Sequence, residues 1–272
     1  MRGKLSFKIL LVGAALCGLA FSASAAPKCG NTSAGFSTWK SDFAKEAASK
    51  GVGKRALAAL NNTSYANATI RADRGQHSFK LSLDEFMRKR GSATIVSRGR
   101  TMKAQNSALF AQLEKKYGVP AGPLIAIWGM ETAFGSYMGK QNTLSAVATL
   151  AYDCRRSEFF TDQLYAALQL IDRGDLDPNA IGAMHGEIGQ TQFLPKNVLL
   201  YGVDGDGNGH IDMIRSRADA LASTANFLRA HGWQAGQGYQ EGQPNFKAIQ
   251  GWNDAGVYQK AIAIMGKQID GR

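Results

Sequence analysis

The sequence predicts a mostly α-helical protein. Apolar residues recur at helical spacing through most of the chain beyond residue 35, glycine or proline marks several segment ends, and strand signals are weak. The 272 residues are 44% hydrophobic and 19% charged, a composition that excludes a disordered chain. This length suffices for one large domain or for two lobes that share a cleft.

Two helices are expected near the start of this region. Residues 36–50 form an amphipathic segment that ends at Gly51, and a shorter helix is expected at 54–60. Residues 61–80 are polar and rich in turn-forming residues, which indicates a connecting segment. Apolar residues then recur at helical spacing over 83–117, so we expect this stretch to be helical as well.

The next helix is the most apolar. It is expected to begin near Pro120 and Pro123, because proline is tolerated in a first helical turn, and to stop near Gly135. Further helices are predicted at 143–152, 157–173, 218–231 and 254–269. Short strands are predicted at 198–203 and 239–246.

The first 26 residues have the pattern of a secretory signal peptide. A positively charged start precedes an apolar run at 9–21 and an Ala-Ser-Ala cleavage pattern at 23–25. An uncleaved anchor helix is the alternative, but the apolar run is shorter than the ~20 residues that a membrane span needs. We therefore expect residues 1–26 to be removed and residues 27–272 to be exported.

The exported chain is basic. Without residues 1–26 it keeps 29 of its 32 Lys and Arg and all 21 Asp and Glu, a net charge of +8. A basic surface attracts polyanions, and outside the cytoplasm a cell-wall polymer or a lipid surface is a better candidate than nucleic acid. Cys29 and Cys154 remain in this chain, and an oxidising compartment favours a disulfide between them over two free buried thiols.

Glu131 is an unusual carboxyl group. It is the only charge between Lys116 and Lys140, it follows a nearly unbroken apolar run, and it precedes Gly135, where its helix is expected to end. Burial and the negative end of the helix dipole both disfavour the carboxylate and would raise the pKa. A carboxyl group that stays protonated near neutral pH can act as a general acid, whereas a structural glutamate with a backbone or arginine partner is the alternative.

The residues around Glu131 resemble a known catalytic motif. Glu-Thr-Ala-Phe-Gly at 131–135 and Met-Gly-Lys at 138–140 are similar to the motif of the B-type lytic murein transglycosylases, glycoside hydrolase family 103. Similar motifs follow in the same order at 144–150, 155–156, 189–195, 204–212, 218–223, 231–233, 252–253 and 258. The resemblance implies a lysozyme-like α fold over residues 27–272, with a helical lobe and a core around a long cleft and an EF-hand-like loop.

The same resemblance implies a reaction. The family cleaves the β-1,4 bond between N-acetylmuramic acid and N-acetylglucosamine in peptidoglycan without water, and the muramoyl C6 hydroxyl attacks C1 to leave a 1,6-anhydro end. Glu131 would protonate the leaving oxygen and then accept the C6 hydroxyl proton. Ordinary glycosidases need a second carboxylate, although assistance from the 2-acetamido group removes this need. Among the nearby acids, Glu187 is the one to examine, and we expect it to be solvated or paired with an arginine.

Two other functions remain open at this point. A hydrolytic muramidase would leave reducing ends. A catalytically silent peptidoglycan-binding protein would lack turnover, although the intact motif at Glu131 argues against the loss of catalysis. The resemblance implies a periplasmic monomer that acts on glycan strands, with no cofactor in catalysis, no nucleic acid and no stable membrane insertion after signal cleavage.

Several residues would contact the substrate by this resemblance. Gln192 would face the active-site sugars, while Gln190 would either do the same or stabilise its loop. Trp252, Asn253 and Tyr258 would line the cleft, with core packing as the alternative, above all for Trp252.

Two adjacent arginines form another candidate contact. Arg155 and Arg156 match a family pair thought to meet the carboxylates of the peptide, for which bidentate pairing by arginine is suited. A surface pair of little consequence is the alternative.

Residues 204–212 follow the beginning of an EF-hand calcium loop. Oxygen-bearing side chains occupy positions 1, 3, 5 and 9, Gly209 makes the turn at position 6, and position 7 supplies a backbone carbonyl. The expected ligands are Asp204, Asp206, Asn208, His210, Asp212 and Asp219. Position 12 is Arg215 instead of glutamate, which opposes metal binding, but the family loop takes its last carboxylate later, a role that Asp219 fits. We expect a structural Ca²⁺, with a metal-free turn as the alternative; zinc is not expected, because no cluster of His and Cys has ligand spacing.

Overall fold

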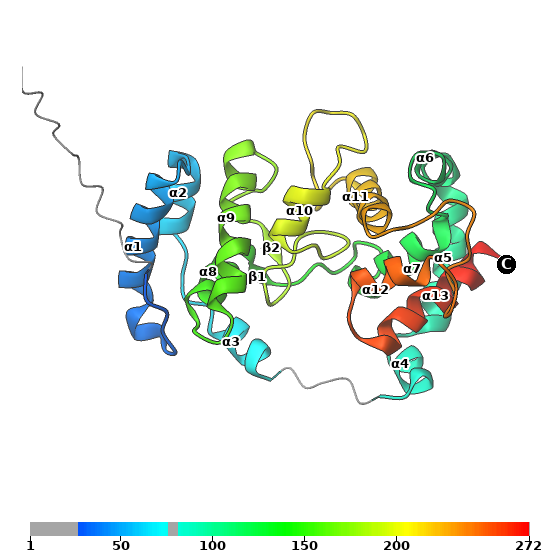
Figure 1. Cartoon of the computed structure of the whole chain (residues 1–272), viewed down its shortest axis with the longest axis horizontal. Helices are drawn as coiled ribbons and strands as arrows, with labels where there is room; N and C mark the ends of the chain where they lie inside the picture. Colours follow the sequence, from blue (N-terminus) through cyan, green and yellow to red (C-terminus); the bar gives the residue numbers. More distant parts are fainter. Residues whose placement is uncertain (1–26, 76–80, 272) are drawn as a thin grey trace, which may run out of the picture.

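A helix that is apolar on all sides lies inside one of two groups of helices. This helix is α7 (Ala121–Thr132), and eleven of its twelve residues are buried. The computed structural model describes residues 27–75 and 81–271, so the expected signal peptide at 1–26 lies outside the described residues. Within the described ranges the chain forms thirteen α-helices, one short 3-10 helix at Ser33–Gly35 and one two-stranded sheet (Figure 1).

The group around α7 contains most of the later helices of the chain. Its members are α4 (Leu83–Lys89), α5 (Ser92–Gln105), α6 (Ser107–Tyr117), α11 (Arg217–Ala230), α12 (Phe246–Trp252) and α13 (Gly256–Asp270). α13 and α5 pack directly against α7. Gly122 allows the close approach of α13, because a Cβ atom there would lie 2.2 Å from the carbonyl oxygen of Gly266. The two helices are also joined where Asp270 accepts a hydrogen bond from the Gly122 amide (2.8 Å).

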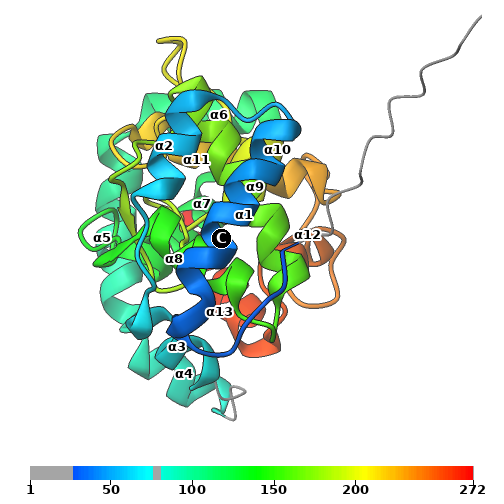
Figure 2. The same ribbon diagram turned by 90° about the vertical axis from the view of Figure 1, so that its left-hand side faces the viewer.

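The second group lies at the opposite end of the molecule (Figure 1). It consists of α1 (Phe36–Ser49), α2 (Lys54–Asn61), α3 (Asn67–Arg74), α8 (Thr143–Tyr152) and α9 (Ser157–Arg173). Viewed from this end, α1, α8 and α9 lie side by side (Figure 2). Aromatic rings of Phe36 and Trp39 pack on Tyr152. Asp172 of α9 accepts hydrogen bonds from the amide of Gly53, just before α2, and from that of Ala56 in its first turn, a donor that helix formation leaves free.

Short elements connect the two groups. β1 (Gln141–Asn142) pairs antiparallel with β2 (Ile181–Gly182), so that Gln141 lies opposite Gly182. α10 (Pro195–Tyr201) follows the loop after β2 and packs against both α9 and α11. None of the helices in the described ranges is both long enough and apolar enough to cross a membrane.

The mostly α fold predicted from the sequence is confirmed, and several boundaries are matched closely. The predicted helices at 143–152 and 157–173 are α8 and α9, and those at 218–231 and 254–269 are α11 and α13 within a few residues. The stretch 83–117 forms three helices instead of one long segment. Gly91, with φ of 66°, separates α4 from α5, and the chain bends again at Asn106.

Three expectations about local structure are wrong. The connection at 61–80 contains α3, which buries Thr69 and Ile70 against its own group of helices. The strand expected at 198–203 is replaced by α10, which begins at Pro195 and buries Val198, and the segment 239–246 forms no strand. Short apolar runs do not distinguish a strand from a buried helical turn, so packing decided these cases.

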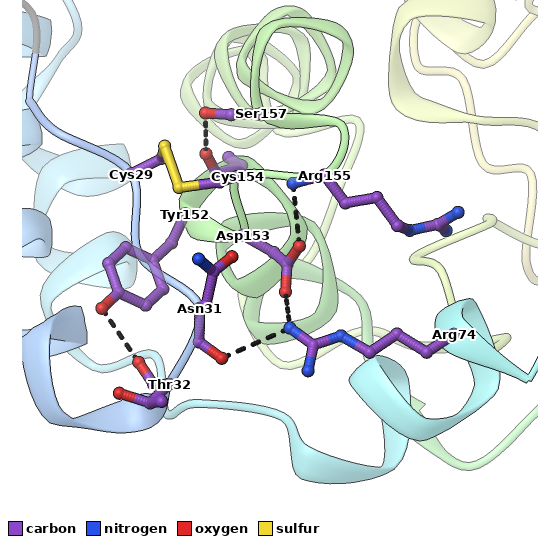
Figure 3. Close-up of a disulfide and its surroundings, with 10 residues drawn as sticks. Cys29, Asn31, Thr32, Arg74, Tyr152, Asp153, Cys154, Arg155 and Ser157 are labelled. Atoms are coloured by element: carbon purple, nitrogen blue, oxygen red, sulfur yellow. Dashed lines mark hydrogen bonds and ion pairs between the residues drawn. A yellow bond between two sulfur atoms is a disulfide. The ribbon is translucent and has the colours of Figure 1, made fainter.

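The disulfide predicted between Cys29 and Cys154 is confirmed (Figure 3). It joins residues 125 positions apart, beside backbone hydrogen bonds from Gly30 to Tyr152 and from Cys154 to Gly30. Asp153 is buried here and accepts a hydrogen bond from Arg74 (2.6 Å; Figure 3). The bridge ties the beginning of the described chain to the turn between α8 and α9, which limits the conformations open to the unfolded chain.

Candidate active site

Glu131 lies at the C-terminal end of α7 and faces a pocket of about 380 Å³. The residues that line this pocket are Glu131, Ala183, Glu187, Gln192, Phe193, Leu194, Asn197, Phe227, Trp252 and Asn253. They come from the end of α7, the loop between β2 and α10, α10 itself, α11 and the end of α12. Segments far apart in sequence therefore meet at this carboxyl group.

The backbone that follows Glu131 is strained. Ala133 and Phe134 have φ values of 49° and 65°, in the left-handed region that residues with a Cβ atom rarely adopt, and Gly135 continues the turn at 79°. Gln192, in the loop on the other side of the pocket, has φ of 54°. Such strained residues persist only where surrounding contacts hold them, and they concentrate at functional sites.

Hydrogen bonds join the turn that follows Glu131 to the loop that contains Gln190 and Gln192. The Thr132 hydroxyl donates to the carbonyl of Gln190 (2.6 Å) and accepts from the Gly135 amide (2.9 Å). The Gln190 side chain accepts from Trp128 Nε1 (3.1 Å) and donates to the Ile214 carbonyl (3.1 Å). Gln190 is buried beneath the pocket and is absent from its described lining, so the structure places it in the loop-stabilising position.

Gln192 lies where the sequence predicted, in the wall of the pocket that Glu131 faces. Its side-chain amide donates to the Gly189 carbonyl (2.7 Å), which fixes the side chain next to its own loop. Asn253 and Trp252 line the same pocket, and the Trp252 ring packs edge-on against Phe193 and Phe227 at 5.3 and 5.2 Å between centroids. The structure thus brings four predicted site residues together.

Two donors bind the same oxygen of Glu131. The Tyr258 hydroxyl donates to Oε1 at 2.6 Å, and Trp252 Nε1 donates to it at 3.1 Å. Oε1 is therefore occupied as an acceptor, and Oε2 is the oxygen that can carry the proton. Tyr258 is buried behind Glu131, in ring contact with Phe86, and it is absent from the described pocket lining, unlike the cleft position expected for it.

The surroundings favour the protonated form of Glu131. Burial raises the pKa of this carboxyl above its ordinary value, and the hydrogen bonds from Tyr258 and Trp252 and the charge of Arg90 only partly oppose this. The negative charge of Glu187 raises the Glu131 pKa further. Burial and the neighbouring Glu131 charge also raise the pKa of Tyr258 well above 10, so its hydroxyl remains a donor. The site therefore favours a neutral carboxyl group at Glu131 and a protonated hydroxyl at Tyr258.

Comparison with known proteins identifies the family. The Transglycosylase SLT domain family matches residues 35–242 of this sequence. The chain belongs to this family. Membrane-bound lytic murein transglycosylase B of Escherichia coli is 40% identical over 122 residues, which are 44% of this chain and 34% of that protein. The matched segment thus spans about a third of the E. coli protein.

Solved structures of related proteins share the fold of this SLT domain. SltB3 from Pseudomonas aeruginosa, in complex with NAG-NAM-pentapeptide, is 29% identical, with a TM-score of 0.82 over 87% of this chain and 80% of that one. E. coli Slt35 in complex with calcium is 24% identical, with a TM-score of 0.73 over 90% and 96% of the two chains. The resemblance to lytic transglycosylases drawn from the sequence is confirmed.

The arginine pair of the SLT domain lies at the turn between α8 and α9. Arg155 Nε donates to Asp73 (2.6 Å), and Arg156 forms an ion pair with the other oxygen of the same carboxylate. Asp73 is buried, and although burial alone would raise its pKa, the two arginines lower it. Neither arginine belongs to the described lining of the Glu131 pocket, and contact with peptide carboxylates stays a prediction.

Glu187 differs from the expectation in its partner. It is paired with His185 and not with an arginine, it lines the pocket of Glu131, and its side chain remains 24% exposed. His185 Nδ1 lies 3.2 Å from Oε1, and the His185 amide donates to Oε2 (3.0 Å). Burial would raise the pKa of Glu187, but these hydrogen bonds and the charge of His185 lower it instead. The histidine two residues before it was the only local signal that could have revealed this pair.

The acidic loop of the SLT domain, residues 204–212, and the first turn of α11 bring three carboxylates together. One oxygen each of Asp204, Asp206 and Asp219 lies within 4.8 Å of the others. Asp219 is fully buried, and it accepts hydrogen bonds from the amides of Gly205 and Asp212 at 2.9 and 2.7 Å. Three hard oxygen donors from two segments, one of them buried, fit the preferences of Ca²⁺.

Other predicted ligands in this loop point to different partners. Asp212 pairs with Arg215 (2.7 Å) and lies outside the carboxylate group. The Asn208 side chain accepts from the His210 amide (2.9 Å). The ligand predicted at His210 is its backbone carbonyl, and its exposed side chain lies 3.9 Å from Asp175. The cation at Arg215 thus engages Asp212 and not the three clustered carboxylates.

Proposed function

We propose that this protein is a lytic transglycosylase that cleaves the β-1,4 bond between N-acetylmuramic acid and N-acetylglucosamine in peptidoglycan. One observation carries the proposal: Glu131, one of the carboxyl groups of the pocket, has a raised pKa and lies at the end of a buried helix. Family membership supports the substrate class. The P. aeruginosa relative SltB3 has been solved in complex with NAG-anhNAM-pentapeptide, which supports the anhydro product.

The proposed reaction needs one proton shuttle. Glu131 donates the proton on Oε2 to the glycosidic oxygen as the bond from that oxygen to C1 breaks. The resulting carboxylate then accepts the proton of the C6 hydroxyl as O6 bonds to C1. Glu131 ends protonated, no water is consumed, and the 2-acetamido group of the sugar assists at C1. Gln192, Asn253 and Trp252 surround the pocket and would hold the sugars by hydrogen bonds and ring contact.

The products test this proposal. Purified sacculi are incubated with the enzyme, and the released muropeptides are analysed by mass spectrometry. We expect 1,6-anhydromuramoyl ends, which weigh one water less than reducing ends. Reducing ends would instead establish a hydrolytic muramidase, and absence of release by folded protein would support a silent binding protein.

We further propose that residues 27–272 form one catalytic domain that acts as a monomer in the periplasm. The pattern of residues 1–26 supports export, and the disulfide between Cys29 and Cys154 is of a kind that persists in oxidising compartments. The net positive charge would attract the domain to an anionic wall.

We also propose that the acidic loop binds a structural Ca²⁺ through Asp204, Asp206 and Asp219. The gathered carboxylates support this, as does the calcium complex of the related Slt35 fold. Calcium at about a hundredfold excess over its Kd is expected to stabilise the domain by about 2.7 kcal/mol, a rise in Tm of roughly 5–10 °C. Thermal unfolding with Ca²⁺ or with a chelator measures this.

Two variants sharpen the calcium measurement. Asp219→Asn is expected to abolish the calcium-dependent rise in Tm, because it removes a charge from the buried ligand. Asp162→Asn is the matched control, since Asp162 is exposed on α9 and pairs with Lys196 outside the loop. Equal Tm values for the wild type in calcium and in chelator would contradict the proposal.

A further inference from the structure

We propose that Glu187 is a positioning residue: an ionised carboxylate, fixed by His185 in the wall of the active-site pocket, whose negative charge keeps the proton on Glu131 until the substrate is bound. The inference rests on the proposed function, because it assigns Glu131 the role of the acid. It extends that function by giving the pocket a second carboxyl group with a different task.

Glu187 is held firmly in this position. Both of its carboxylate oxygens are engaged by His185, one by the ring and one by the backbone amide. An ionised carboxylate can only accept, so His185 Nδ1 donates. The turn itself is closed where the Ala183 amide donates to the Glu187 carbonyl (3.2 Å). It is packed on α8 at Gly186, where a Cβ atom would lie 2.3 Å from the Val147 side chain.

The other side of His185 faces a second carboxylate. His185 Nε2 is buried, has no hydrogen-bond partner within the described residues, and lies 3.9 Å from Asp73. Asp73 is itself held by Arg155 and Arg156. A continuous series of ionisable side chains therefore runs from the pocket to the arginine pair, and the imidazole ring of His185 lies between two carboxylates.

Two charges with opposite effects act on Glu131. Glu187 lines the same pocket and raises its pKa, whereas Arg90, at the end of α4, lowers it. Tyr258 and Trp252 complete the surroundings as neutral donors. Two carboxyl groups in one pocket with pKa values displaced in opposite directions are the usual arrangement of an acid and a separate charged carboxylate.

The position of Glu187 also suits the developing charge of the substrate. Cleavage of a glycosidic bond leaves positive charge on C1 and the ring oxygen, and a fixed anion in the same pocket stabilises it. The nucleophile in the proposed reaction is the C6 hydroxyl of the substrate, so Glu187 needs neither to attack C1 nor to activate water. A role as base for water would instead give reducing ends.

Glu187→Gln tests the proposal directly. The protonation of Glu131 is followed by ¹³C NMR of the glutamate carboxyl carbons, with its signal assigned from its absence in Glu131→Gln. We expect the Glu131 midpoint to move to lower pH by roughly one pH unit when the charge of Glu187 is removed. The basic limb of the pH–rate profile on sacculi is expected to move with it. Above both midpoints, a one-unit shift lowers the protonated fraction, and hence the rate, about tenfold.

Matched variants separate charge from structure. Glu158→Gln removes the same charge from an exposed position in the first turn of α9, and it is expected to leave the Glu131 midpoint unchanged. Glu187→Asp keeps the charge and is expected to leave the Glu131 midpoint close to its wild-type value. If Glu187→Gln does not fold, Glu187→Ala serves instead, since it also removes the charge of Glu187 and is expected to move the Glu131 midpoint in the same direction.

The outcomes are distinct for the two proposals. A Glu131 midpoint that is the same in folded Glu187→Gln and in wild type overturns the positioning role. The NMR measurement uses no substrate, so it decides this point even if the products have reducing ends. Products with reducing ends from the wild type overturn the proposed function, and their loss in Glu187→Gln would reassign Glu187 as the base for water.

Discussion

The Glu131→Gln variant is expected to release no measurable muropeptides from sacculi while it remains folded. Glutamine has nearly the same shape as the protonated acid, and its carbonyl oxygen can still accept from Tyr258 and Trp252. It cannot donate an acidic proton to the leaving oxygen, and removal of a general acid lowers rates by about 10²–10⁴-fold. Mass spectrometry of released products measures the loss, and circular dichroism confirms the fold.

The stability of this variant provides an independent check on the state of Glu131. The folded pKa of Glu131 is raised above its unfolded value, so its contribution to stability is complete below the unfolded pKa and is lost as pH rises through the folded pKa. Glutamine does not titrate, so the Glu131→Gln variant does not lose stability in this way as pH rises. We therefore expect the variant to gain stability relative to wild type as pH rises, measured by denaturant unfolding at several pH values. Activity within tenfold of wild type, or a relative stability that falls with pH, would contradict the assignment.

Local patterns in the sequence predicted the part of the site that is local in structure. The apolar run before Glu131 predicted an apolar helix that stops near Gly135, and α7 ends at Thr132 with eleven of its twelve residues buried. The same reasoning gave α8 and α9, because their apolar residues recur at helical spacing. Glu131 could therefore be recognised from its own neighbours as an acid in an apolar setting.

The partners of Glu131 could not be derived in this way. Tyr258 lies 127 positions along the chain, and nothing in the pattern of α13 separates a ring that packs in the core from one that binds the acid. Gln190 and Gln192 are two residues apart in one motif, yet only Gln192 lines the pocket, because the loop turns between them. The pairing of Glu187 with His185 also depends on the turn geometry, which the residue types alone do not specify.

Tyr258→Phe is expected to lower kcat by about tenfold to a hundredfold with little change in KM. The hydroxyl bond to Oε1 strengthens as Glu131 becomes a carboxylate, so it stabilises the transition state more than the bound substrate. A hydrogen bond to a charged group contributes about 1.5–3 kcal/mol, which corresponds to this loss of rate. Steady-state kinetics on soluble glycan fragments measures both constants.

The pH dependence of Tyr258→Phe has a predictable sign. The hydrogen bond from Tyr258 lowers the pKa of Glu131, so its removal raises that pKa and moves the basic limb of the pH–rate profile to higher pH, opposite to the direction expected for Glu187→Gln. Tyr239→Phe is the matched control, since it removes a buried tyrosine bond of 2.7 Å to Asp270, away from the pocket. A structural effect alone would lower the Tm of Tyr258→Phe and of Tyr239→Phe and would leave their pH–rate profiles in place. If the basic limb moves to higher pH in Tyr258→Phe and to lower pH in Glu187→Gln, both side chains must act on the proton of Glu131.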